Sequence, residues 1–181
     1  MSKDKLSVFL SLILRHKPEE IGITLDKHGW ANVQELITGI NNTGRKIDMA
    51  TLEEIVRTDN KGRYSFNEDK TSIRANQGHS IPVDVDLKET IPPDMLFHGT
   101  ATRFLNSIKQ QGIKPMNRLY VHLSKDVETA IKVGSRHGKP AVLEINAKQM
   151  CADGIKFYLS DNGVWLTKHV DWKYVVGADY V

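Results

Sequence analysis

Cysteine is almost missing from this 181-residue sequence, which contains only Cys151. One cysteine excludes an internal disulfide and a zinc site built on a cysteine pair. Also missing are an apolar run near the roughly 18 residues of a membrane-spanning helix and the N-terminal pattern of a secretory signal. We therefore expect a cytoplasmic protein without a membrane segment, in which Cys151 is a partly buried structural residue.

Charge of one sign is not concentrated anywhere. The formal net charge is +3, with 12 basic and 11 acidic residues before Pro82 and 13 basic and 11 acidic residues after it. Proteins that coat long nucleic acids usually carry a pronounced basic stripe. We expect any nucleic-acid contact here to be local and confined to a few phosphates. The small size and the lack of an obvious apolar patch favour a monomer.

Common nucleotide and metal motifs are missing too. The sequence has no G-x-G-x-x-G after a strand and no G-x-x-x-x-G-K-[ST], which argues against a Rossmann dinucleotide site and a P-loop. Its seven histidines form no H-E-x-x-H motif and no close pair with a carboxylate, so we expect no metal site.

Helical patterns are present in the first third of the chain. Apolar residues at i, i+3 and i+4 predict a helix over residues 6–14, and Pro18 ends it because the residue before a proline avoids helical geometry. Asn32 with Glu35 reads as a capping box, and Asp48 as the cap of a third helix. The sequence therefore predicts three short helices before residue 60.

A hairpin pattern follows the helices. Residues 63–66 and 71–74 are alternating runs on either side of a polar turn at residues 67–70. Helices followed by a hairpin are typical of a winged-helix module, which we place at residues 1–82.

The rest of the chain has a different pattern. Residues 83–94 are acidic and rich in proline, and we interpret them as a linker. From residue 95 to residue 181, apolar runs alternate with helical stretches, which predicts a mixed α/β lobe. The predicted fold class is therefore α+β, with one lobe at residues 1–82 and a second at residues 95–181.

Short basic clusters lie at distant points of the chain. Arg15 and His16 fall at the end of the first helix, where the helix dipole alone favours cations, so a structural role stays open for them. Arg74 should face outward if Ile73 packs inward. Guanidinium groups bind phosphate through paired hydrogen bonds. Converging side chains of this kind would suit a phosphate site. Arg136, between Gly134 and Gly138, is likewise either a cation that stabilises the end of a helix or a member of a phosphate site.

Two histidine motifs stand in the second lobe. His98-Gly99-Thr100 should follow a strand and precede a helix, so that Gly99 lets a ligand approach the backbone and the helix N-terminus offers amides to a pyrophosphate. His122 should point to a cleft or to solvent, opposite Val121 and Leu123. A single strand histidine is more often structural than functional, so both interpretations stay open.

These clusters, in this order and with Val121-His122-Leu123-Ser124, resemble the NAD-dependent RNA 2'-phosphotransferase family over nearly the whole chain. The resemblance implies a winged-helix RNA-binding lobe followed by an ADP-ribosyltransferase-like lobe. It implies catalytic roles for Arg15, His16, Arg74 and Arg136. It further implies RNA contacts from Lys17, Asn76, Gln77, Gly78 and His79, and NAD contacts from His98, Gly99, Thr100, His122, Leu123, Ser124 and Val164.

The reaction implied by the resemblance consumes NAD and needs no metal. An RNA 2'-phosphate attacks the nicotinamide ribose, and transesterification then releases 2'-hydroxyl RNA, typically tRNA, and ADP-ribose 1'',2''-cyclic phosphate. Most related ADP-ribosyltransferases carry a glutamate on a later strand. Residues 163–167 contain no acid, and Val164 stands in that place.

Two other functions remain open at this stage. An ADP-ribosyltransferase that modifies terminal phosphates of nucleic acid, or other acceptors, would share the first step but form no cyclic phosphate. A winged-helix regulator that senses NAD would bind it without turnover and would tolerate the loss of Arg136. Residues 48–56, however, contain no Lys or Arg, which is unusual for a helix that reads duplex DNA.

Overall fold

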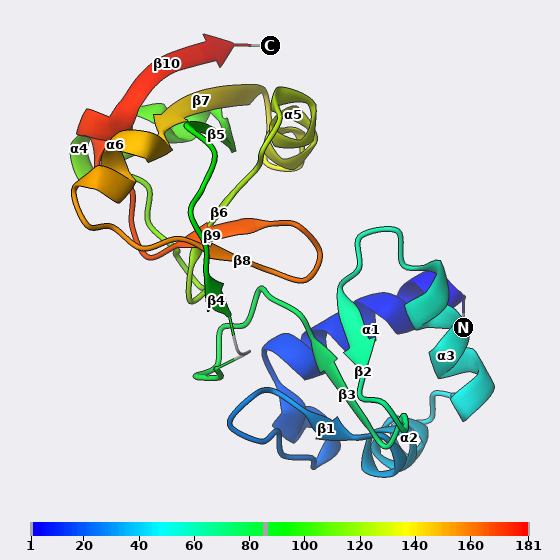
Figure 1. Cartoon of the computed structure of the whole chain (residues 1–181). Helices are drawn as coiled ribbons and strands as arrows, with labels where there is room; N and C mark the ends of the chain where they lie inside the picture. The colour runs from blue at the N-terminus through cyan, green and yellow to red at the C-terminus, as the bar shows by residue number, and fades with distance from the viewer. Residues whose placement is uncertain (1, 85–86, 181) are drawn as a thin grey trace. The chain divides into compact units, whose positions relative to one another are not determined.

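The computed structural model describes residues 2–84 and 87–180. The chain forms two compact units, residues 1–86 and residues 87–181, which we call unit 1 and unit 2 (Figure 1). Both combine helices with antiparallel sheets, as expected for a mixed α/β protein. No helix in the described part of the chain is long and apolar enough to cross a bilayer.

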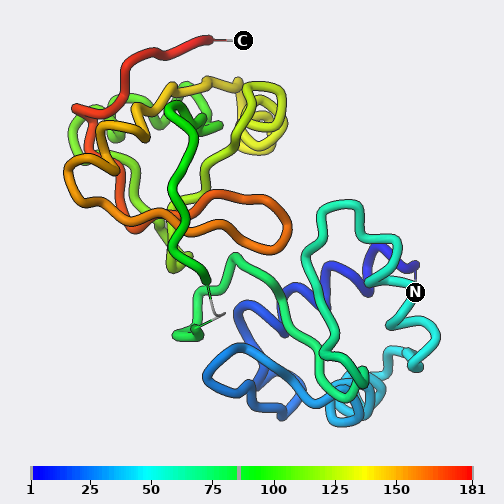
Figure 2. Tube along the Cα trace, in the orientation of Figure 1, coloured from blue at the N-terminus to red at the C-terminus, as the bar shows by residue number. Residues whose placement is uncertain are grey.

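Unit 1 contains three α-helices and one three-stranded sheet among its described residues. The sheet order is β1-β3-β2, with both pairs antiparallel. Its elements are α1 (Lys3–Arg15), η1 (Pro18–Ile21), β1 (Ala31–Asn32), α2 (Val33–Asn42), α3 (Met49–Thr58), β2 (Tyr64–Phe66) and β3 (Ser72–Ala75). The path of the chain through them can be followed in Figure 2.

The helix boundaries of unit 1 confirm the predicted local signals. The side chain of Asn32 accepts a hydrogen bond from the amide of Glu35 at 3.0 Å. The carboxylate of Asp48 caps α3 by accepting one from the amide of Thr51 at 2.8 Å. Because side-chain oxygens satisfy amides that have no partner inside the helix, they fix where each helix begins.

The core of unit 1 fixes the direction of Arg74. Ile73 is fully buried and packs with residues of all three α-helices, such as Leu10, Leu36 and Leu52. Successive strand residues point to opposite faces of a sheet, so Arg74 lies away from this core and is half-buried. The predicted orientation of Arg74 is therefore confirmed. Strand β1, which the sequence did not predict, adds the third strand beside β3.

Unit 2 contains two antiparallel sheets in its described part, ordered β10-β7-β5 and β4-β8-β9-β6. A bridge between Phe97 and Ser124 brings β5 next to the end of β6. The elements are β4 (Lys88–Glu89), β5 (Met95–Ala101), η2 (Thr102–Phe104), α4 (Leu105–Gln111), β6 (Val121–Leu123), α5 (Val127–Ser135), β7 (Pro140–Asn146), α6 (Ala147–Ala152), β8 (Tyr158–Leu159), β9 (Trp165–Thr167), η3 (Trp172–Tyr174) and β10 (Val175–Tyr180).

Helix α5 approaches strand β5 so closely that side chains are excluded from the contact. A Cβ atom on Gly99 would lie 1.8 Å from the carbonyl oxygen of Ala130, and one on Gly134 would lie 2.5 Å from that of Thr100. Both distances are far below any real non-bonded contact, so only glycine permits this packing. On the side where a side chain would project, Gly99 therefore packs directly against α5.

One sequence prediction for unit 2 was wrong. His98-Gly99-Thr100 lies inside β5, which continues to Ala101, and α4 begins only at Leu105. The motif is therefore part of the strand rather than after it, and the 3-10 turn η2 separates it from the N-terminus of α4. The final strand, β10, begins at Val175, directly after the 3-10 turn of residues 172–174.

The segment predicted as a linker, residues 83–94, includes strand β4, which pairs with β8. Residues 85 and 86 lie outside the described residues. The lobe boundaries predicted from the sequence, residues 1–82 and residues 95–181, stay a prediction.

Candidate functional site

In unit 1, the end of α1 and the segment after β3 form a basic cluster. We call Arg15, His16, Arg74 and His79 the Arg15 cluster. The amide of Ser80 donates to the carbonyl oxygen of Arg15 at 3.0 Å, and Nδ1 of His16 lies 2.8 Å from Oγ of Ser80. The last carbonyls of a helix have no partner inside it. The segment therefore completes the helix end and holds two residues of the cluster in place.

Gly78 makes room for the guanidinium of Arg15. Its φ of +88° lies in the left-handed region that favours glycine. A Cβ atom there would lie 3.4 Å from both Cζ and Nε of Arg15. Gly78 thus allows the backbone to turn and to pass close to this side chain.

His79 is the buried member of the cluster, with 2% of its surface exposed. Burial lowers the pKa of His79 to about 4, and the positive charges of Arg15, His16 and Arg74 add to the effect. His79 is therefore neutral at pH 7. The pKa of His79 is lowered because its ring lies away from water and because positive side chains are close to it. Three side chains that can carry positive charge therefore lie near one buried, neutral ring.

The other residues predicted to contact RNA differ in their exposure. Asn76 is buried and donates to the carbonyl of Gly62 at 2.8 Å, so it fixes the backbone of the turn. Gln77 is half-buried. Lys17 is exposed and forms an ion pair with Glu20 at 3.5 Å. Lys17 and Gln77 are the members of this set whose side chains reach the surface of unit 1.

In unit 2, histidines of adjacent strands contact each other. Nδ1 of His98, on β5, lies 3.1 Å from the carbonyl oxygen of His122, on β6. A carbonyl only accepts, so Nδ1 of His98 carries the proton. Burial lowers the pKa of His98, and the charge of His137 adds to this, although the bond to His122 opposes it. His98 is therefore neutral at pH 7 and has Nε2 available as an acceptor.

Two arginines accompany these histidines. Nη1 of Arg118 lies 2.9 Å from Nδ1 of His122. Burial of the guanidinium lowers the pKa of Arg118, even though the residue as a whole is exposed, and the charge of Arg136 lowers it further. Arg136 follows the last residue of α5, as predicted. We call His98, Arg118, His122 and Arg136 the His98 cluster.

Arg118 was missed by the sequence analysis. It lies in the irregular segment between α4 and β6, where no periodicity indicates a direction. Arg118 stands four residues before His122, and no spacing rule connects residues across such an irregular segment, in which Met116 has a φ of +57°. A non-glycine residue in that region is uncommon, and sequence alone did not predict it.

The remaining predicted NAD-binding residues have structural roles in unit 2. Leu123 and Thr100 are buried. Ser124 exchanges two backbone hydrogen bonds with Phe97, both at 2.8 Å. Val164 precedes β9 and closes a turn by donating from its amide to Oγ of Ser160 at 3.0 Å. None of the described side-chain contacts connects Val164 to the His98 cluster.

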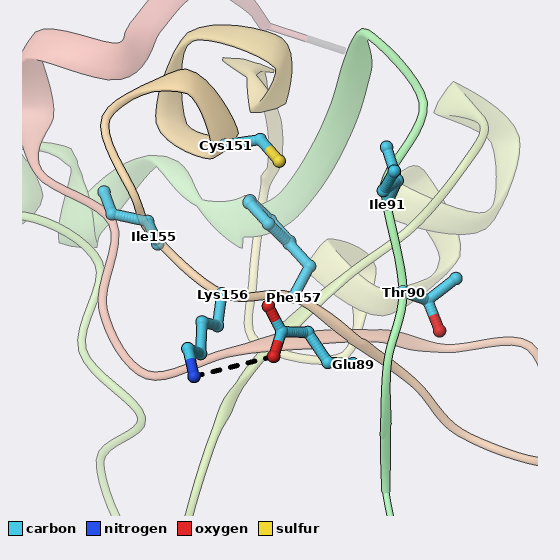
Figure 3. A pocket seen from close by; sticks show the side chains of 7 residues that line it. All are labelled: Glu89, Thr90, Ile91, Cys151, Ile155, Lys156 and Phe157. Atoms are coloured by element: carbon cyan, nitrogen blue, oxygen red, sulfur yellow. Dashed lines mark ion pairs between the residues drawn. The ribbon is translucent and has the colours of Figure 1, made fainter.

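Unit 2 also has a pocket of about 320 Å³. Figure 3 shows its lining, with Cys151 above the ring of Phe157 and the ion pair of Lys156 and Glu89 at one side. The other lining residues are Thr90, Ile91 and Ile155. No predicted site residue is among them. Cys151 is half-buried, as expected for a structural residue.

Comparison with known proteins identifies the family. The profile described as "RNA 2'-phosphotransferase, Tpt1 / KptA family" matches residues 1–169. The chain belongs to this family. Three relatives carry the name "Probable RNA 2'-phosphotransferase". The relative from Fusobacterium nucleatum is 58% identical, over 94% of this chain and 96% of its own length. The relative from Flavobacterium johnsoniae is 52% identical, over 94% of this chain and 93% of its own length. The relative from Acaryochloris marina is 54% identical, over 96% of both chains.

Membership of this family agrees with the expected resemblance. The match includes Arg15, Arg74, Arg118 and Arg136 within a single profile, so both clusters lie in the part of the chain that the RNA 2'-phosphotransferases share.

Proposed function

We propose that the chain removes an internal 2'-phosphate from RNA by transferring it to NAD. The observation that carries the proposal is the Arg15 cluster, where Arg15, His16 and Arg74 lie near the buried, neutral His79. A dianionic phosphate needs several positive donors to be held away from water. The cluster supplies them in the unit that we predict to bind RNA.

The His98 cluster suits the NAD side of the reaction. Nε2 of the neutral His98 is an acceptor for a ribose hydroxyl, and Arg118 and Arg136 carry positive charge for a pyrophosphate or a developing phosphate charge. Bound NAD supplies an electrophilic ribose carbon and a leaving group. The residues contribute position and charge rather than a covalent intermediate.

The proposed chemistry balances without a metal or an oxidant. In the first step, a 2'-phosphate oxygen bonds to C1'' of the nicotinamide ribose as the bond to nicotinamide breaks. In the second, the ribose 2''-hydroxyl attacks phosphorus and the RNA 2'-oxygen leaves with the proton. The products are 2'-hydroxyl RNA and ADP-ribose 1'',2''-cyclic phosphate. Arg15, His16 and Arg74 bind the phosphate, and Arg136 stabilises the charge of the second step.

The experiment uses the purified chain and a short RNA with one internal 2'-phosphate, with and without NAD, in EDTA. Products are resolved by mass. We expect loss of the phosphate that depends on NAD and appearance of ADP-ribose cyclic phosphate. RNA that keeps its phosphate and gains a stable ADP-ribose would instead identify a transferase that stops after the first step. No change in the RNA would contradict both.

A further inference from the structure

The ring of Trp30 lies against Arg74, one member of the Arg15 cluster. Trp30 immediately precedes β1, whose first residue, Ala31, pairs with Ile73, the neighbour of Arg74 in β3. Cζ of Arg74 lies 4.5 Å from the centre of the Trp30 ring. The guanidinium is therefore within the distance at which a cation is attracted to an aromatic face.

The backbone before Trp30 is closed into a tight loop. The carboxylate of Asp26 accepts hydrogen bonds from the amides of His28 at 2.8 Å and Trp30 at 3.0 Å. The amide of Asp26 donates to the carbonyl of Trp30, and that of Gly29 donates to the carbonyl of Asp26, each at 3.0 Å. Four hydrogen bonds within five residues hold the backbone from which the ring of Trp30 projects.

The same loop contacts a second member of the cluster. Gly29 is buried with a φ of +84°, and a Cβ atom there would lie 3.3 Å from Nε2 of His79. The loop thus packs against His79 through Gly29 and against Arg74 through Trp30. Trp30 itself is half-buried and is not among the described residues of the unit 1 core.

The ring of Trp30 gives Arg74 an attractive contact beside other positive charges. Arg15 and His16 are the other cationic groups near His79, and like charges repel one another when the site is empty. An aromatic face attracts a guanidinium without using its N–H donors, which lie in the plane of the group. Stacking on Trp30 therefore fixes the plane of the Arg74 guanidinium. It orients the N–H groups of that guanidinium so that they can donate to a phosphate.

We propose that Trp30 is a positioning residue, which holds Arg74 by stacking so that the guanidinium can bind the 2'-phosphate. The inference rests on the proposed function, since it assigns the phosphate to the Arg15 cluster. It predicts that the ring of Trp30 affects the binding of the phosphate and not the binding of RNA in general.

The test compares two RNA oligonucleotides that differ only in carrying a 2'-phosphate or a 2'-hydroxyl at one internal position. Dissociation constants are measured for the whole chain without NAD, so that no turnover occurs, and their ratio gives the selectivity for phosphate. Trp30→Leu should lower this ratio about 3- to 30-fold, the range expected for a partly desolvated cation–π contact. Trp30→Phe, which keeps an aromatic face, should retain most of it.

Trp172→Leu is the matched control, because Nζ of Lys109 lies 6.0 Å from the centre of the Trp172 ring in unit 2. It should leave the ratio unchanged. A ring-fluorinated tryptophan at position 30 gives a variant of nearly the same shape, in case Trp30→Leu does not fold. Fluorine weakens the negative face of the ring, so the ratio should fall as fluorines are added.

The outcomes separate the two proposals. A wild-type chain that binds both oligonucleotides equally would overturn the proposed function and this inference with it. A wild-type chain that prefers the phosphate, with the same ratio in Trp30→Leu or in the fluorinated series, would overturn the role of Trp30 alone. Equal losses in Trp30→Leu and Trp30→Phe would show that packing, not stacking, is what matters.

Discussion

The guanidinium of Arg118 fixes which ring nitrogen of His122 carries the proton. Arginine only donates, so Nδ1 of His122, 2.9 Å from Nη1 of Arg118, must accept. The proton of neutral His122 is then on Nε2. His98 has the opposite tautomer, because its Nδ1 donates to the carbonyl of His122. The two neutral rings therefore carry their protons on different nitrogens, Nδ1 in His98 and Nε2 in His122.

Removing Arg118 should release the tautomer of His122 and weaken NAD binding. Hydrogen bonds to charged groups contribute about 1.5–3 kcal/mol, so we expect Arg118→Ala to weaken binding of NAD at least about tenfold by calorimetry. In the wild type, nitrogen NMR should detect the proton of His122 on Nε2, and in the variant a mixture of tautomers. Arg103→Ala, which removes a cation beside Phe104 in the same unit, is the control. Equal NAD affinity in both variants would contradict the role of Arg118.

Arg136→Ala should slow the second chemical step more than the first. The phosphorus becomes most crowded with negative charge during transesterification, and a cation at that point stabilises the transition state. We expect RNA carrying ADP-ribose on its 2'-phosphate to accumulate in rapid-quench samples analysed by mass. If that intermediate stays undetectable at every quench time while overall turnover falls, Arg136 acts in the first step or in binding.

Unit 1 should lose stability in mild acid because of His79. Its pKa is about 4 in the folded chain and near 6.5 when unfolded. Between these values the unfolded state binds more protons, so the contribution is fully present above pH 6.5 and is lost as the pH falls toward 4. The whole effect is about 3 kcal/mol at most.

His79→Asn should remove about 2 kcal/mol of the difference in free energy of unfolding between pH 7 and pH 4.5. The measurement is urea unfolding monitored by the NMR signals of unit 1. His137→Gln, at an exposed position of unit 2, should leave the pH dependence of unit 1 intact. A steep dependence that survives in His79→Asn would assign it to other groups.

Gly99→Ala should destabilise unit 2 severely. Its Cβ would overlap the carbonyl oxygen of Ala130, so α5 would have to separate from β5, at a cost of about 3 kcal/mol or more. Gly154→Ala is the control, because Gly154 has a φ of +87° but no atom within 4 Å of a Cβ. It should cost about 1 kcal/mol, from backbone strain alone. Thermal unfolding of the two variants gives the comparison, and similar midpoints would contradict the packing argument.

Sequence patterns predicted the parts of the fold that depend on neighbouring residues. Caps at Asn32 and Asp48, and the outward direction of Arg74, follow from local chemistry, and all three are confirmed. Two-residue strands such as β1, β4 and β8 were missed because they are defined by partners far along the chain.

The candidate site was harder to predict for the same reason. The close approach of Gly99 to Ala130 could not be predicted from the sequence, because it depends on the packing of α5 on β5. Arg118 approaches His122 because the chain turns at Met116, and no spacing rule covers an irregular segment. The residue types indicated a site that binds phosphate through arginine and histidine. The partner of each side chain, by contrast, depends on the tertiary structure.

The hydrogen bond between His16 and Ser80 joins residues 64 positions apart. Helix α1 can form as soon as its own residues have been synthesised, but the end that bears Arg15 stays open until Ser80 donates to it. Closing so long a loop is entropically costly and slow compared with helix formation. During synthesis Arg15 and His16 therefore emerge early. The contacts that hold them together with Arg74 and His79 form last, when the whole of unit 1 has left the ribosome.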